Sequence, residues 1–371
     1  MILATWIILI IWGFLFRNSK KISFFQMLFM IILIVNNVNN PDYSVTENSF
    51  NMAKNGIDIF SGNWLLKLIY FVIGFIGNFQ MALFVIALLS FCLIYKAILF
   101  YTDKISYVLS LYMIASFVID ATQIKNFFAM AIWLYFSRFL YDAYVEKKNT
   151  NSVNVALIWK YILGVFLAMS IHVSFAITIV YLLIIFMDTK KMVVLGIIMA
   201  TVSCLSANIT SVLGSLAKQL SRTGGIFYFV YDKFIAYSYT NSNNLIVRLQ
   251  LEIIFFGLVT FIFLVRRNKG LLKLKYQFLP NFMFDLNIVV LIIIPLMFFS
   301  TVFYRFQRNL LVIIYSVLAN ALVDSFVIKR IQKGRDIITF LVSLAPAFFY
   351  LLIDAIIWNY DAVFMKLFWM S

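Results

Sequence analysis

One residue stands out as a candidate for chemistry because the chain contains it only once. His172 is the single histidine, and it lies in the stretch SIHVSF between two apolar runs. An imidazole titrates near pH 6.5, so it can accept or donate a proton at neutral pH. A lone histidine can also be a packed side chain, but an unpaired imidazole in an apolar bundle costs free energy. We therefore expect His172 to be a catalytic residue.

Three carboxylates compete with His172 for the role of a general base. Asp42 follows the second apolar run, Asp120 begins the turn DATQIKN, and Glu252 lies one helical turn after Arg248. Structural interpretations exist as well, since Asp120 could cap a helix and Arg248 could form a surface pair with Glu252. No paired acidic motif marks a divalent metal site, so we expect metal-independent chemistry and no cofactor.

Cationic and polar residues on the same side of the predicted bundle suggest an anionic ligand. The stretch YRFQR at residues 304–308 holds two arginines, whose planar guanidinium groups bind phosphate oxygens in pairs. The alternative is that these arginines reach toward lipid phosphates from a helix end. The predicted substrate-binding residues are Arg305, Arg308, Arg248, Arg222, Lys125, Gln123, Asn126, Tyr43 and Tyr304.

The elements that must position these residues are membrane-spanning helices. The chain is 64% hydrophobic and 12% charged, with a mean hydropathy of +0.98. These values exclude a soluble globular domain, and continuous apolar runs predict helices rather than barrel strands. We expect an all-α polytopic transmembrane bundle that forms a single integral membrane domain, residues 1–371. Its twelve predicted spans are 1–16, 22–38, 79–95, 104–120, 124–145, 155–171, 173–187, 191–209, 248–265, 284–303, 306–328 and 336–357.

Clusters of lysine and arginine predict the orientation of the bundle. Short basic loops stay in the cytoplasm, and placing all of them there puts both termini and the loops 39–63 and 210–247 outside.

The apolar segment 64–77 is too short to span, so we expect a re-entrant or interfacial segment, with a short thirteenth helix as the alternative. The loop 210–247 is rich in Tyr, Asn and Ser, which suits either sugar binding or an interfacial aromatic belt. A net charge of +15 in such a chain reflects cytoplasmic loops and lipid contacts rather than nucleic acid.

Several of these residues together resemble the EpsG family of Wzy-like bacterial polysaccharide polymerases. The matching residues are Asp42 and Tyr43, Gln123 and Ala129, and His172 and Ser174, so the resemblance is best over about residues 40–190. Two positions depart from the family pattern. Lys125 stands where arginine is usual and supplies charge without a bidentate fork, and GNWLLK at residues 62–67 lacks the expected acidic residue.

The resemblance implies a membrane glycosyltransferase of capsule or exopolysaccharide assembly. Such an enzyme joins oligosaccharide repeat units carried on polyprenyl (undecaprenyl) pyrophosphate, at the outer face of the bacterial cytoplasmic membrane. The expected partners are that lipid-linked oligosaccharide, the bilayer and other polysaccharide-assembly proteins. The alternatives are a ligase-like glycosyltransferase of O-antigen assembly, a membrane acyltransferase, and a flippase for polysaccharide repeats. A flippase should carry charged residues deep in several spans, whereas the predicted spans are nearly all apolar at mid-membrane.

Overall fold

The computed structural model describes residues 2–38, 40, 42–205, 215, 218–219, 222, 245–267, 274–293, 305–325, 347–348, 351–352, 360 and 365–368. Within these ranges all regular secondary structure is helical, as the sequence predicts. One described helix, Phe79–Tyr101, is long and apolar enough to cross a bilayer by length and composition, and several apolar helices of 10–17 residues are shorter. The number of twelve spans therefore stays a prediction.

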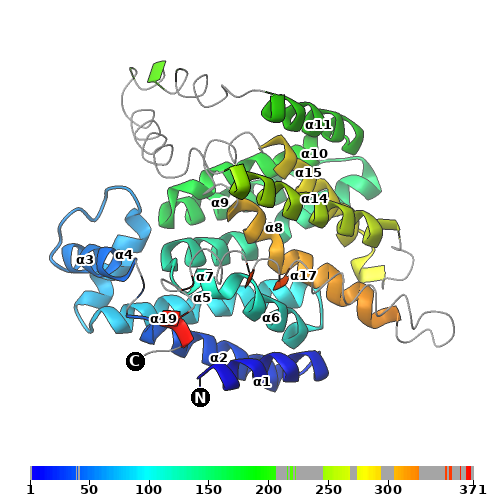
Figure 1. Cartoon of the computed structure of the whole chain (residues 1–371). Coiled ribbons are helices and arrows are strands. Elements are labelled where there is room, and N and C mark those ends of the chain that lie inside the picture. The colour runs from blue at the N-terminus through cyan, green and yellow to red at the C-terminus, as the bar shows by residue number, and fades with distance from the viewer. Residues whose placement is uncertain are drawn as a thin grey trace.

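Most of the predicted spans coincide with helices of the structure (Figure 1). In the first half these are α1 (Ile2–Leu15), α2 (Lys20–Asn36), α5 (Phe79–Tyr101), α8 (Ile124–Thr150) and α9 (Val155–Ile171). The second half contains α11 (Thr189–Leu205), α14 (Leu245–Arg267), α15 (Leu279–Ile292), α17 (Arg305–Ser325) and a short α19 (Met365–Phe368). The span predicted at 336–357 lies almost wholly outside the described residues.

Two predicted spans are not single α-helices. The segment 104–120 divides into α6 (Ile105–Ile114) and α7 (Ser116–Asp120), with Ala115 between them at φ −99° and ψ −86°. The segment 173–187 is a 3₁₀ helix, η1 (Val173–Leu182), followed by one α-helical turn, α10 (Leu183–Phe186). Neither break contains Gly or Pro, so no local sequence signal marks it.

The predicted loop 39–63 contains a helix. The helix α3 (Tyr43–Lys54) packs against α4 (Trp64–Gly74), and both project from one end of the bundle (Figure 1). Phe50 of α3 contacts Tyr70 of α4 with ring centroids 5.6 Å apart and Phe79 of α5 at 5.7 Å. At 11 residues α4 is too short to cross a bilayer, which agrees with the prediction of a short, non-spanning segment.

Side-chain hydrogen bonds join helices at each of the two ends of the bundle. At the first, which we call the turn end, the Asn37 side chain after α2 donates to the carbonyl of Ala121 before α8, 3.4 Å away. At the second, which we call the lysine end, the Asn320 amide of α17 donates to the Tyr101 carbonyl at 2.9 Å and accepts from Thr102 at 2.6 Å. The lysine end also holds the clustered basic residues Lys20, Lys21, Lys96, Lys104, Lys147, Lys148, Lys190 and Lys191. The structure thus gathers the basic loops of its described part at one end, as their sequence positions predict.

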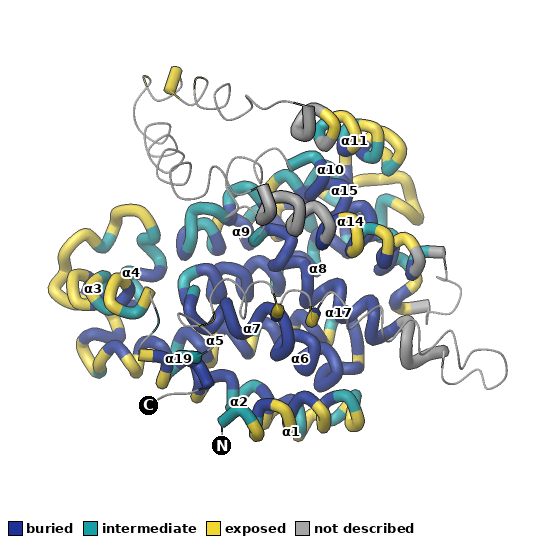
Figure 2. Tube along the Cα trace, viewed as in Figure 1, coloured by how far each residue is buried: buried dark blue, intermediate teal, exposed yellow. Residues whose placement is uncertain are grey.

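Side-chain amides fasten the buried faces of these helices to each other. Gln26 of α2 donates to the Leu9 carbonyl of α1 at 3.1 Å and to the Ser110 hydroxyl of α6 at 2.9 Å. The central helices α6, α7 and α8 are buried, and exposed residues concentrate on the outer helices α1, α3 and α11 (Figure 2). Since a bilayer offers no water to satisfy polar groups, such internal bonds fix the positions of the helices that carry the candidate site.

Candidate functional site

The break between α6 and α7 brings a tyrosine and a carboxylate together. The Tyr112 hydroxyl on α6 donates a 2.9 Å hydrogen bond to Oδ2 of Asp120, the last residue of α7. In a straight helix two residues eight positions apart would be separated by about 12 Å along the axis, beyond the reach of one tyrosine. The change of direction at Ala115 therefore places the Asp120 carboxylate next to its partner.

A buried arginine is the second partner of Asp120. The Nη2 atom of Arg308, in the first turn of α17, lies 3.1 Å from Oδ1 of Asp120 and donates a 3.0 Å hydrogen bond to the Gln123 side-chain oxygen. Neither Asp120 nor Arg308 is more than 1% exposed. The sequence predicted that Arg308 binds substrate and that Asp120 could be a base. In the structure each charge is engaged with the other, an arrangement that suits a positioning role, and the predicted substrate-binding and base roles stay predictions.

Arg305 occupies a different environment one turn before Arg308. It begins α17 and is half-buried rather than fully buried. Its positive charge acts on both Asp120 and His172, so the guanidinium lies within electrostatic range of the two. The start of a helix also carries partial positive charge from unpaired backbone N–H groups. Arg305 is therefore the more accessible of the two arginines of YRFQR, at a helix start that favours an anion.

His172 lies in the turn between α9 and η1, where backbone bonds hold it in place. Its N–H donates to the Ala168 carbonyl at 2.9 Å, and its carbonyl accepts from the Phe175 N–H at 3.0 Å. The Nδ1 atom is 2.6 Å from the Ser174 hydroxyl oxygen. Burial, followed by the positive charges of Arg305 and Lys125, lowers the pKa of His172 to about 4. The imidazole is consequently neutral at physiological pH, and Ser174 occupies one of its two nitrogens.

The charge of Lys125 acts both on His172 and on the segment that follows α2. Lys125 lies in the first turn of α8, half-buried, and its charge interacts with His172, with Asp42 and with Lys67 of α4. Asp42 and Tyr43, the early pair in the sequence, thus stand near the turn that carries Gln123. Three cations and two carboxylates meet at the turn end: Lys125, Arg305, Arg308, Asp42 and Asp120.

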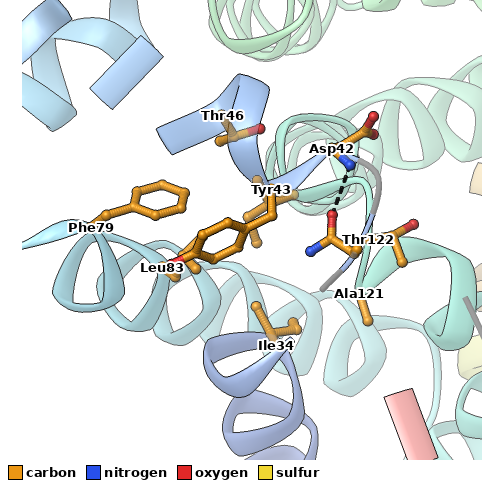
Figure 3. Close-up of a pocket in the computed structure, with 10 residues that line it drawn as sticks. Ile34, Asp42, Tyr43, Thr46, Phe79, Leu83, Ala121 and Thr122 are labelled. Carbon is orange, nitrogen blue, oxygen red and sulfur yellow. Dashed lines mark hydrogen bonds between the residues drawn. The ribbon is translucent and has the colours of Figure 1, made fainter. Parts of the chain in front are cut away.

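A small pocket lies between this early pair and the turn before α8 (Figure 3). Tyr43, Asp42 and Thr122 line it, together with apolar side chains of α2 and α5. The Tyr43 ring packs against the Phe79 ring with centroids 5.0 Å apart, whereas the Asp42 carboxylate points away from both rings. The Tyr43 hydroxyl accepts a hydrogen bond from Gln80 at 3.2 Å. The pocket volume, about 10 Å³, is close to the minimum that holds one water molecule, so the pocket is too small for a sugar.

The other predicted site residues divide into three groups. Asn126 is 2% exposed and lies one residue after Lys125; its side-chain nitrogen and oxygen have no partner among the described residues. Arg222 is exposed. Arg248 and Glu252 are on α14, but their side chains lie outside the described residues, as does Tyr304. Within the described residues no cluster of three His, Cys, Asp or Glu side chains could hold a metal ion.

The sequence did not predict two contacts of the site, that of Tyr112 with Asp120 and that of Ser174 with His172. Tyr112 sits in a mainly apolar stretch, and the break at Ala115 brings it to Asp120. Ser174 matched the family pattern, but its bond to His172 depends on the chain direction after α9. The spacing of His172 and Ser174, two residues apart at a helix end, was the one available signal.

The comparison with protein families shows to which family the chain belongs. The sequence model of the EpsG family matches residues 20–362, which is most of the chain. The chain belongs to the EpsG family. No curated protein and no solved structure matches the chain significantly. EpsG membership makes the chain a membrane protein with a broad role in polysaccharide polymerisation, as the resemblance implied.

EpsG membership also extends the resemblance along the chain. The motifs that carried it lie within residues 40–190, whereas the family match continues through α14, α15 and α17. The start of α17, with Arg305 and Arg308, therefore lies within the residues that the family model matches, and Arg308 contacts Asp120 directly.

Proposed function

We propose that this EpsG protein is a glycosyltransferase that polymerises polyprenyl-pyrophosphate-linked oligosaccharide repeat units at the outer face of the cytoplasmic membrane. One arrangement carries the proposal: Arg305 at the start of α17 and Lys125 in the first turn of α8 lie within electrostatic range of His172 at the end of α9. A pyrophosphate leaving group needs cations, and an attacking sugar hydroxyl needs a proton acceptor. These three side chains, from two helices and the turn after α9, supply both within one polar cluster.

The reaction exchanges one bond at the anomeric carbon. The acceptor hydroxyl oxygen forms a bond to that carbon while the bond from the carbon to the pyrophosphate oxygen breaks. Arg305 and Lys125 stabilise the negative charge that remains on the lipid pyrophosphate. The hydroxyl proton passes to Nε2 of His172, because Nδ1 is engaged by Ser174. For Nε2 to be a base, the Nδ1–H must donate to the Ser174 oxygen.

Arg308, Asp120 and Tyr112 form the support for this cluster. Arg308 and Asp120 neutralise each other, and Arg308 also fixes Gln123, two residues before Lys125. Because the pair is fully buried, its geometry is held by packing as well as by charge. We assign these three as positioning residues, and we retain His172 as the base in preference to Asp120.

The lysine end is assigned to the cytoplasm and the turn end to the outer face. The support for this orientation is the gathering of basic loops at the lysine end. Single cysteines at Lys148 and Asp58, in a chain with its own cysteines replaced, test it in intact cells. An impermeant thiol reagent should label position 58 and not position 148. The reverse pattern would contradict the outer-face location.

Loss of the gene in its host tests the activity. The mutant should accumulate lipid pyrophosphate carrying single repeat units that are accessible from outside the cell, and it should lack long polymer. Accumulation of repeat units only on the cytoplasmic side would indicate a flippase instead. In proteoliposomes, purified protein should convert lipid-linked repeat units into polymer. An Arg305→Gln variant should not, whereas Lys20→Gln, at the lysine end, should retain activity.

A further inference from the structure

A second pocket lies at the lysine end, on the opposite side of the bundle from the proposed active site. It has a volume of about 280 Å³ and is formed by the end of α5, the second half of α8 and residues 275–279. Ligand pockets in proteins are commonly about 300–1,000 Å³, so this one suits a single small headgroup or sugar and excludes an oligosaccharide chain. The proposed polymerase chemistry uses none of its residues.

The pocket lining contains hydrogen-bonding groups that lack protein partners. The Asp142 carboxylate is half-buried and makes no hydrogen bond or close ion pair with any described residue. The hydroxyls of the buried Tyr141 and Tyr276 also lack partners within the described part of the chain, whereas the lining residue Asn149 is exposed. Buried or half-buried polar groups normally find partners, so this set is suited to a ligand with several hydroxyl groups.

The charges around the pocket select against a cationic ligand. Arg138, one turn before Asp142 on α8, lies within electrostatic range of its carboxylate and offsets its charge. Lys275 lines the pocket with its ammonium 5.0 Å from the centre of the Tyr276 ring. Lys148 and Arg266 act on the Asp285 carboxylate and Lys147 donates to the Ile185 carbonyl, so these three cations are engaged outside the pocket lining. Lys275 is therefore the lining cation placed to bind an anionic group, while Arg138 offsets the charge of Asp142.

Together these features lead us to infer that the pocket binds a phosphate-linked polyol, with the phosphate at Lys275 and the hydroxyls at Asp142 and Tyr141. Aromatic rings from Phe100 and Phe278 supply apolar surface beside this polar set. The position at an end of the bundle suits a lipid headgroup such as phosphatidylglycerol. A soluble sugar phosphate has the same chemistry, and the experiment separates the two sources.

Lipid retention measured by native mass spectrometry tests the inference. Purified protein is equilibrated with phosphatidylglycerol or phosphatidylethanolamine, which share the phosphate but differ in having a diol or an amine. The wild type should retain phosphatidylglycerol about ten-fold better, as expected for hydrogen bonds to a charged acceptor. Asp142→Asn should reduce that preference to about two-fold, Tyr141→Phe should reduce it less, and Lys275→Gln should weaken retention of both lipids.

Matched controls are available at the same end of the bundle. Asp103→Asn and Lys191→Gln change the same residue types away from the pocket lining and should leave retention unchanged. Displacement of phosphatidylglycerol by glucose 1-phosphate would assign the site to a soluble sugar phosphate, whereas lack of displacement would assign it to the lipid. Equal retention of the two lipids by the wild type overturns the inference. An unchanged preference for phosphatidylglycerol in both Asp142→Asn and Tyr141→Phe also overturns it. The Tyr141→Phe variant keeps the ring that packs against Phe282, so its fold should be preserved.

Discussion

Arg308 of α17 and Asp120 of α7 form a fully buried ion pair, with 3.1 Å between Nη2 and Oδ1. Removing one member of such a pair leaves an uncompensated charge and costs about 3–5 kcal/mol. Arg308→Ala and Asp120→Ala should therefore each reduce folded protein, and the thermal unfolding of the purified variants should show it.

A double variant separates the structural role of this pair from catalysis. Arg308→Met with Asp120→Leu removes both charges and should recover much of the stability that each single variant loses. It should not recover polymerisation, because Gln123 loses its partner and the turn before Lys125 loses a tether. Single variants that unfold at the wild-type temperature would show that the pair contributes nothing to the fold.

Arg305 provides the cleaner test of pyrophosphate binding because it is half-buried and begins its helix. Arg305→Gln should unfold near the wild-type temperature and lose at least about 100-fold in polymerisation rate, the order of effect for one charge-stabilising group. Arg305→Lys should restore only part of the rate, since an ammonium does not form the bidentate contact. The rates are measured with lipid-linked repeat units in proteoliposomes. Full activity of Arg305→Gln would remove the arginine from the proposed site.

The fold class and the grouping of basic loops could be predicted from the sequence because both depend on local patterns. Apolar runs identified α1, α2, α5, α8 and α9 within a few residues. The break at Ala115 and the 3₁₀ turn after His172 depend on tertiary packing, with no Gly or Pro to mark them. For the same reason, the sequence identified Asp120, Arg308 and His172 as candidates but did not show which of them are paired.

The neutral state of His172 predicts an unusual pH profile. Its pKa is lowered to about 4 by burial and by the charges of Arg305 and Lys125, so a base at this position stays unprotonated until the solution is strongly acidic. Polymerisation should be nearly constant from pH 8 to about 5.5 and should fall below that, whereas an ordinary histidine would lose half its base form near pH 6.5. Removing a nearby positive charge favours protonation, so the acid limb of a slow Arg305→Gln variant should move to higher pH. An acid limb centred at 6.5 in the wild type contradicts this assignment.

Removal of the Ser174 hydroxyl should lower the rate of polymerisation rather than the binding of substrate. The hydroxyl lies 2.6 Å from Nδ1 of His172 and holds the ring orientation and tautomer that leave Nε2 as the base. Ser174→Ala should lower kcat about ten-fold with little change in KM, since the pyrophosphate contacts stay intact. Ser174→Thr keeps a hydroxyl and should retain most of the activity. Equal losses in both variants would indicate a packing role for Ser174.

The close packing of α1 against α6 predicts that a small substitution far from the site, Gly13→Ala, destabilises the protein. A Cβ at Gly13 would overlap the Ser110 hydroxyl and the Gln26 amide, and it would come within 2.6 Å of the Ser106 carbonyl. These groups form the hydrogen bonds that join α1, α2 and α6, so they have little freedom to move. Gly13→Ala should destabilise the protein by about 1–3 kcal/mol, measured by thermal or denaturant unfolding in detergent. Gly257→Ala in α14 is the matched control, because nothing lies within 4 Å of its added carbon. Equal stability of the two variants would mean that α1 separates from α6 at little cost, and that the amide of Gln26 does not hold them together.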